Sequence, residues 1–296
     1  MNSKAQKILA KYFNEIENRL YSFTQNKDSF QKNVVKAAEY SLSAGGKRIR
    51  PVLMLEFYKS CGGKKDVLSI ACAIEMLHTF SLIHDDLPCM DNDDFRRGKP
   101  SCHKAFGEAA ALLAGDALAV LPFEIISREA LSGNIDALTA VKLISELSHA
   151  VGTDGMIGGQ IIDIENENNN ISEDFLKNLD SLKTGALIRA SCVMGCILAG
   201  ADENKLSSAV LYAEKIGLAF QIVDDILDVT STFEELGKPI SSDERQNKTT
   251  YVTLLGLEKS KLEANRLTKE AVAVLDNFDD SDFLKELTLM LLDRNN

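Results

Sequence analysis

The sequence has few of the residues that interrupt helices or mark sheets. It contains no tryptophan and 5 prolines in 296 residues, and aromatic residues make up 6% of the chain. Long β-branched runs that alternate with polar residues, the signature of half-buried strands, are also scarce. Because 45% of the residues are hydrophobic, the chain can still bury a sizeable core. This composition argues against a β-sandwich or an α/β sheet and favours helices packed on helices.

Positive charge is in deficit, with 33 basic residues against 44 acidic ones and a net charge of −11. Such a chain repels nucleic-acid backbones and anionic membrane surfaces, so we expect no nucleic-acid partner and no stable membrane association. No continuous apolar run approaches the roughly 18 residues of a membrane span. The six cysteines include no CxxC pair, and the first twenty residues lack the apolar core of a signal peptide. We therefore expect a soluble, cytoplasmic protein.

Apolar residues recur with the 3.6-residue period of helices along most of the chain. The period predicts helices over 5–23, 32–43, 50–61, 66–90, 107–131, 135–150, 173–199, 203–229 and 258–275, with a last apolar helix after the acidic turn at 276–284. Glycine- and proline-containing breaks separate them, but no linker divides the chain. We predict one all-α domain over residues 1–296, a bundle of roughly ten or more helices.

Two acidic clusters follow strongly apolar segments. The first is HDDLPCMDNDD at 84–94, and the second is QIVDDILD at 221–228. In the second, Asp224 and Asp228 are four residues apart and so lie about 40° apart around a helix, with Gln221 one turn earlier. Like charges at that spacing repel unless a cation sits between them. Carboxylates with open positions left for water and phosphate are the ligands that Mg²⁺ prefers.

The first cluster needs a break in its helix to act in the same way. Asp85 and Asp91 are six residues apart and would point about 120° away from each other on a straight helix. Pro88 lacks an N–H and its ring clashes with the preceding turn, so we predict a kink or bulge within 86–91. On an unbroken helix, Asn92 and Asp93 would align with Asp85 and Asp86 instead.

Basic segments accompany the acidic clusters. They are GGKRIRP at 45–51, RRGKP at 96–100, KTG at 183–185, GKP at 237–239 and KTT at 248–250. Glycine permits close backbone approach, and arginine matches phosphate oxygens with two parallel hydrogen bonds. One acidic cluster alone, or one basic loop alone, is most often merely solvated surface. Together they predict a metal–diphosphate site.

The ordered set of motifs resembles a known family. GGKRIRP, SLIHDDLPCMDNDDFRRGKPS, AGDAL, GGQIID, LKTGALI, FQIVDDILD, LGKP and KTTY are similar, over essentially the whole chain, to the bacterial-type farnesyl and geranylgeranyl diphosphate synthases. The resemblance implies an isoprenoid-synthase-type bundle around a central substrate cavity. It also implies an Mg²⁺-dependent trans-prenyltransferase, acting as a homodimer, that condenses isopentenyl diphosphate with dimethylallyl and geranyl diphosphates to give farnesyl diphosphate.

The resemblance also assigns site residues. The Mg²⁺ ligands would be Asp85, Asp86, Asp91, Asp224 and Asp228. Isopentenyl diphosphate would be bound by Lys47, Arg50, His78 and Arg97. The allylic diphosphate would be bound by Arg96, Lys183, Thr184, Gln221, Lys238 and Lys248. The residues that would act in catalysis are Arg96 and Lys183, together with Asp85, Asp86, Asp91, Asp224, Asp225 and Asp228.

Product length depends on Phe80. It lies five residues before Asp85, roughly 7.5 Å further along the helix, where the resemblance implies that a large aromatic side chain closes the product tunnel. Ser81 beside it is small, so we predict the C15 product, with C20 as the alternative. Phe80 could instead be ordinary helix-packing core.

Two other functions remain open at this point. A class I terpene cyclase shares one aspartate-rich helix, but it usually has a different second metal motif and no GGKRIRP loop. A non-catalytic synthase subunit should have lost acidic or basic site residues, and none is visibly missing from this sequence.

Overall fold

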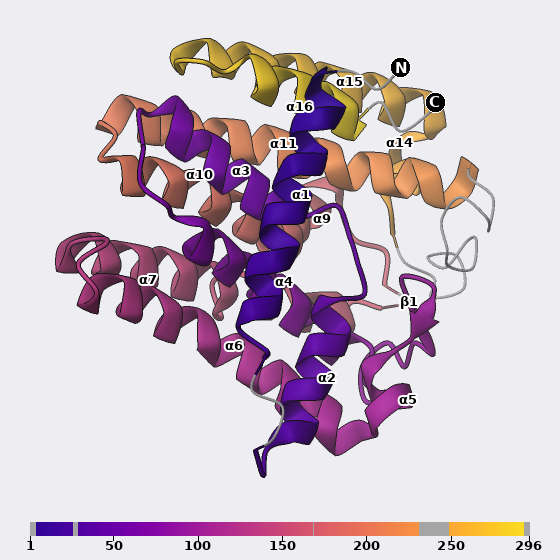
Figure 1. The fold of residues 1–296 in the computed structure, drawn as a ribbon. Helices are drawn as coiled ribbons and strands as arrows, with labels where there is room; N and C mark the ends of the chain where they lie inside the picture. The colour runs from indigo at the N-terminus through magenta and orange to yellow at the C-terminus, as the bar shows by residue number, and fades with distance from the viewer. Residues whose placement is uncertain (1–3, 26–28, 168, 231–248, 293–296) are drawn as a thin grey trace. The chain divides into compact units, whose positions relative to one another are not determined.

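The structure is a computed structural model that describes residues 4–25, 29–167, 169–230 and 249–292 (Figure 1). The described residues are almost entirely helical, with one short hairpin, which confirms the all-α prediction. The chain forms two compact units. Unit 1 comprises Met1–Leu55 and Lys65–Ile144, and unit 2 comprises Glu56–Lys64 and Ser145–Asn296. That the whole chain is a single domain stays a prediction.

Unit 1 is organised around a buried helix. Its elements are α1 (Lys4–Ser22), α2 (Lys32–Leu42), the first part of α3 (Ile49–Ser60), α4 (Leu68–Asp85), β1 (Phe95–Arg96), β2 (Lys99–Pro100), α5 (Cys102–Phe106), α6 (Glu108–Leu131) and the first half of α7 (Ala137–Val151). Every residue of α4 from Ser69 to Leu77 is buried, as expected for a helix that is apolar on all faces. In Figure 1, the magenta α6 runs beside α4 and α2, which it contacts.

Unit 2 is organised around its longest helix. Besides the ends of α3 and α7, it contains α8 (Met156–Glu165), α9 (Glu173–Asp180), the π-helical turn η1 (Ser181–Gly185), α10 (Ala186–Ala199), α11 (Glu203–Thr230), α14 (Tyr251–Leu255), α15 (Leu257–Val274), the 3₁₀ turn η2 (Leu275–Asn277) and α16 (Asp282–Leu292). The orange α11 lies along the yellow α15 in Figure 1 and also contacts α10. Ile222 and Ile226 of α11 join Leu176, Leu179 and Tyr251 in one hydrophobic core.

Most predicted helices are present, with several differences. The helix expected over 173–199 is divided by η1 into α9 and α10, and the short helices α5 and α14 were not predicted. The helix expected over 66–90 begins at Leu68 and ends at Asp85. Helix α8 was not among the predicted segments, because the glycines of its sequence MIGGQIIDIE obscure the apolar period. These glycines are needed for packing: a Cβ on Gly159 would lie only 2.7 Å from the Cα of Lys183. Glycine at this position therefore lets α8 pack against the backbone of η1.

Three helical stretches are strongly apolar, although none is a continuous apolar run. Glu108–Leu131, Glu173–Ala199 and Glu203–Thr230 are long and apolar enough to cross a membrane, judged by length and composition alone. In their most apolar windows, 39%, 56% and 44% of the residues are buried inside the protein. A large part of this apolar character therefore serves helix packing.

We expect Gly159→Ala to destabilise unit 2. The added Cβ would overlap the backbone of Lys183, and overpacking of this kind typically costs about 1–3 kcal/mol. Urea denaturation followed by circular dichroism measures the change. Gly217→Ala is the matched control, because its Cβ would lie 3.4 Å from the Cα of Gly185, an ordinary contact distance. Equal stability of the two variants would contradict the close packing of α8 on η1.

Candidate active site

The chain turns back on itself after the first two aspartates of the first acidic cluster. Helix α4 ends at Asp85, and the N–H of Asp91 donates to the carbonyl of Asp85 over 2.9 Å. The N–H of Asn92 similarly donates to the carbonyl of Leu87 over 3.2 Å. The predicted break within 86–91 is therefore confirmed, as a helix end followed by a tight turn. It brings the backbone of Asp91 beside that of Asp85, as two ligands of one ion require.

Asp86 is engaged by an arginine of the hairpin. It is 2% exposed, and Arg96 donates to its Oδ1 from Nε over 2.9 Å and also from Nη2. Burial raises the pKa of Asp86, although the neighbouring Arg96 opposes the shift. Arg96 also reaches Oδ2 of Asp93 over 3.3 Å. Asp86 thus holds the guanidinium of Arg96 in place, and its role as a metal ligand stays a prediction.

The predicted isopentenyl diphosphate residues include a histidine between cations. Burial lowers the pKa of His78 well below its ordinary value, and the charges of Arg50 and Arg97 lower it further. His78 is therefore neutral at pH 7 and lies near two arginines, a combination suited to an anion. Lys47 is exposed in the loop before α3, and Arg50 lies in the first turn of that helix. The structure thus brings His78, Arg50 and Arg97 together within unit 1.

Unit 2 contains a polar cleft of about 180 Å³. Four residues predicted from the sequence line it: Lys183, Thr184, Gln221 and Asp225. The ammonium group of Lys183 lies 2.6 Å from Oδ2 of Asp163, which keeps this cation at the cleft. Lys183 and Thr184 belong to η1, and π-helical turns often occur at functional sites.

Hydrogen bonds order the second acidic cluster. Thr184 donates its hydroxyl to Oε1 of Gln221 over 3.4 Å, and Gln221 donates from Nε2 to Oδ1 of Asp225 over 3.1 Å. The other oxygen of Asp225 accepts from the N–H of Tyr251 over 2.8 Å, at the start of α14. Both carboxylate oxygens of the buried Asp225 therefore bond to the protein, and this residue positions Gln221 and α14.

The remaining aspartates fit a magnesium site by their chemistry. Asp224 and Asp228 lie on the regular helix α11, which confirms their placement on one face. Within the described ranges, no group of three or more His, Cys, Asp or Glu side chains could hold a metal by itself. Mg²⁺ is usually bound by one or two carboxylates together with substrate phosphates and water, so pairs of carboxylates suffice. Asp85 with Asp91 in unit 1, and Asp224 with Asp228 in unit 2, are the fitting pairs, and a joint site of both pairs stays a prediction.

Two predicted residues cannot be placed. Lys238 and Lys248 lie outside the described residues. Three others that shape the site were not predicted: Arg48, Glu75 and Asp180. The sequence does contain a sign that Glu75 has a charged partner. It is the one charged residue in the apolar run IACAIEML, and a buried charge needs a partner. No sequence pattern indicates the role of Asp180, because its burial depends on the packing of α9 against its neighbours.

Comparisons with known proteins identify the family of this chain. The profile of the polyprenyl synthetase family matches residues 31–289. The chain belongs to this family. It is 42% identical over 289 residues to the farnesyl diphosphate synthase of Bacillus subtilis, covering 97% of each chain. It is 46% identical over 268 residues to the geranylgeranyl diphosphate synthase of Cyanophora paradoxa, covering 89% of this chain and 88% of that protein.

A solved structure of a family member is also similar. The geranyltransferase of Helicobacter pylori, complexed with magnesium and isoprenyl diphosphate, has a TM-score of 0.81 and 38% sequence identity. The match covers 99% of this chain and 98% of that one. The likeness therefore extends over the acidic clusters, the basic loop and the cleft together.

The raised pKa of Asp180 predicts that the stability of the protein depends on pH. Burial, with the negative charge of Asp225, raises its pKa to about 8, whereas an unfolded aspartate titrates near pH 4. Between these values the folded protein retains a proton that the unfolded chain releases, so this carboxyl makes the free energy of unfolding fall as pH rises from about 4 to about 8. Asp180→Asn should remove this contribution, so the variant gains stability relative to the wild type between pH 5 and pH 8.

Urea denaturation at several pH values in that interval, without substrate, measures the effect. Asp174→Asn is the control, because Asp174 is exposed in the first turn of α9. A stability difference between Asp180→Asn and the wild type that stays constant with pH would show that Asp180 ionises normally.

Proposed function

We propose that this protein is an Mg²⁺-dependent trans-prenyltransferase that condenses isopentenyl diphosphate with dimethylallyl and then geranyl diphosphate, giving farnesyl diphosphate and diphosphate. Membership of the polyprenyl synthetase family supports the class of reaction. The farnesyl diphosphate synthase of B. subtilis, similar over 97% of each chain, supports the product.

One observation carries the proposal: the chain has a cationic anion site besides its aspartate clusters. His78 with Arg50 and Arg97 can bind a diphosphate without metal, whereas carboxylate pairs can bind one only through a cation. Two chemically different diphosphate sites suit two diphosphate substrates. A condensation needs both, and a terpene cyclase, which acts on one diphosphate, needs only the metal-dependent site.

In this proposal, one group of residues acts on the allylic diphosphate and another binds isopentenyl diphosphate. Bound Mg²⁺ would neutralise charge on the allylic diphosphate and help it to leave. Arg96, held by Asp86, and Lys183, held by Asp163, would stabilise the same leaving group as the allylic C–O bond ionises. Arg50, Arg97 and His78 would orient isopentenyl diphosphate so that its alkene attacks C1 of the cation. Loss of a proton, which the released diphosphate can accept, completes the product.

The setting of Phe80 supports the C15 product. Phe80 is 8% exposed, and its ring meets that of His84 edge to face at 5.3 Å. His84 in turn lies 3.0 Å from the carbonyl oxygen of Leu112 on α6. The ring is therefore held by neighbours, as a wall that stops chain growth requires. Ser81 is small, and its hydroxyl bonds to the carbonyl of His78 over 2.9 Å.

A geranylgeranyl product is the second candidate, supported by the similarity to the C. paradoxa enzyme. A terpene cyclase and a non-catalytic subunit are weaker candidates, because the cationic site and both aspartate clusters are retained. We also propose that the protein acts in the cytoplasm as a homodimer without stable membrane association. Its six free cysteines and net charge of −11 support the location, and the exposed Leu112, Leu113 and Val120 on α6 support contact with a second copy.

A product assay tests the function directly. Purified protein is incubated with Mg²⁺, labelled isopentenyl diphosphate and each of the C5, C10 and C15 allylic diphosphates. We expect consumption of the C5 and C10 starters and a C15 product. Accumulation of a C20 product from all three starters would replace the farnesyl assignment, and a hydrocarbon product without use of isopentenyl diphosphate would indicate a cyclase.

Replacement of Asp85 or Asp224 by alanine should lower kcat by at least about 100-fold, because each change removes a ligand of the metal that neutralises the leaving group. Circular dichroism should show nearly unchanged helicity. Chelation of Mg²⁺ should abolish activity, and added Mg²⁺ should restore it.

Asp282→Ala serves as a control for the loss of an acidic residue, since Asp282 is an exposed residue in the first turn of α16. Turnover by Asp224→Ala close to that of the wild type would rule out a metal role for the second cluster.

Phe80→Ala separates a tunnel wall from ordinary core. If Phe80 limits product length, the variant should still condense its substrates but release C20 and longer products, measured by chromatography. If Phe80 serves only packing, the product should stay at C15 while the free energy of unfolding falls by roughly 3–5 kcal/mol.

A further inference from the structure

The loop that joins α2 to α3 has an unusual backbone. Three of its residues have positive φ: Gly45 at 88°, Gly46 at 124° and Arg48 at 51°. Glycine adopts such angles freely, but a residue with a Cβ does so only when its surroundings hold it there. An arginine in this conformation therefore needs strong interactions of its side chain, and strained residues of this kind concentrate at functional sites.

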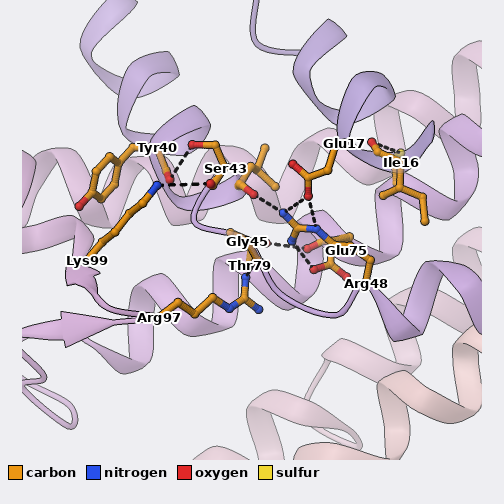
Figure 2. Close-up of polar contacts among 12 residues, drawn as sticks. Ile16, Glu17, Tyr40, Ser43, Gly45, Arg48, Glu75, Thr79, Arg97 and Lys99 are labelled. Carbon is orange, nitrogen blue, oxygen red and sulfur yellow. Dashed lines mark hydrogen bonds and ion pairs between the residues drawn. The ribbon is translucent and has the colours of Figure 1, made fainter. Parts of the chain in front are cut away.

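The side chain of Arg48 has those interactions (Figure 2). Its Nε donates to Oε1 of Glu17 on α1 over 2.6 Å, and its Nη1 donates to Oε1 of Glu75 on α4 over 2.6 Å. Its Nη2 donates to the carbonyl of Leu42 at the end of α2. Arg48 is 2% exposed, so a substrate cannot touch its guanidinium. One buried side chain thus connects the loop to three helices of unit 1.

The loop is also held by residues of the hairpin. The guanidinium of Arg97 donates from Nη1 to the carbonyl of Gly45, as Figure 2 shows. A Cβ on Gly46 would lie 2.6 Å from Cζ of Arg97 and would displace this guanidinium from its present position. Lys99 reaches the carbonyl of Ser43 over 3.5 Å. The side chain of Arg48 therefore anchors one end of the loop to the helices, and the hairpin contacts the other end.

Arg48 lies between Lys47 of the loop and Arg50 in the first turn of α3. Lys47 before it is exposed, and Arg50 after it lowers the pKa of His78 by its charge. Its partner Glu75 is three residues before His78 on α4, hence on the same side of that helix. The bond between Arg48 and Glu75 therefore ties the chain just before α3, which carries Arg50, to the helix that carries His78.

We propose that Arg48 is a positioning residue for isopentenyl diphosphate: through Glu75, Glu17 and the end of α2 it holds the loop so that Lys47, Arg50, His78 and Arg97 meet one diphosphate. This inference rests on the proposed function of these four residues. It makes the affinity for isopentenyl diphosphate depend on a buried side chain that never contacts it, while the allylic diphosphate depends on other residues.

Two variants test the role, with steady-state KM measured for each substrate. Arg48→Lys retains the charge but cannot reach all three acceptors. The double variant Arg48→Met/Glu75→Met removes the buried pair as a whole, and apolar replacement of both partners is often tolerated where removal of one is not. Glu17 is partly exposed and can be hydrated in that variant.

Arg19→Met is the matched control. Arg19 also connects α1 to the start of α4, through Oγ of Ser69 at 2.6 Å and Oδ2 of Asp66 at 2.8 Å, but these partners lie away from the loop. A thermal unfolding curve for every variant shows how stability changes independently of substrate.

We expect the KM for isopentenyl diphosphate to rise at least about tenfold in both Arg48 variants, since misplaced phosphate contacts lose affinity on that order, while the KM for geranyl diphosphate changes less than about threefold. Arg19→Met should alter neither. Equal changes in both KM values, or none, in a folded Arg48 variant would overturn the proposal, and Arg48→Lys decides if the double variant does not fold. A wild-type protein that never consumes isopentenyl diphosphate would instead refute the proposed function itself.

Discussion

The cost of removing a charge from water governs the site in both units. Each charged side chain that enters the interior needs a partner, because an unpaired buried charge loses its hydration without compensation. Glu75 of α4 and Asp86, the residue that follows this helix, are buried in unit 1, and arginines from other segments neutralise them. Arg48 forms an ion pair with Glu75, and Arg96 forms one with Asp86. These pairs place the loops, and the loops carry the cations that face a substrate.

In unit 2, buried charge is compensated by hydrogen bonds more than by ion pairs. Asp225 is buried and accepts from Gln221 and from the backbone of Tyr251, so it joins α11 to α14. Lys183 is balanced by Asp163. The close approach of α8 and η1 that permits this pairing depends on Gly159, where any larger residue would overlap the backbone of Lys183. A glycine that looks like a helix breaker in sequence is thus what allows the cation to reach the cleft.

A net charge of −11 is compatible with binding diphosphates because local charge differs from the total. The cations around His78 offer a positive site within unit 1, where burial and two arginines keep the imidazole neutral. In the proposed function the aspartate pairs would bind Mg²⁺, and the bound ion would reverse the sign of the field that the substrate meets. Part of the acidic excess would then serve metal binding, and the proposed substrate sites would remain favourable for anions.

The sequence by itself determined the features that depend on near neighbours along the chain. Helical periods, the shared face of Asp224 and Asp228, and the break caused by Pro88 all follow from local backbone geometry. The order of motifs identified the family. Tertiary structure decided which charges are partners. Arg48 and Glu75 are 27 residues apart, Lys183 and Asp163 are 20 apart, and the raised pKa of Asp180 depends on Asp225 and on burial. The strength of these interactions depends on distance and on exclusion of water, and both are set only when helices distant in sequence pack together.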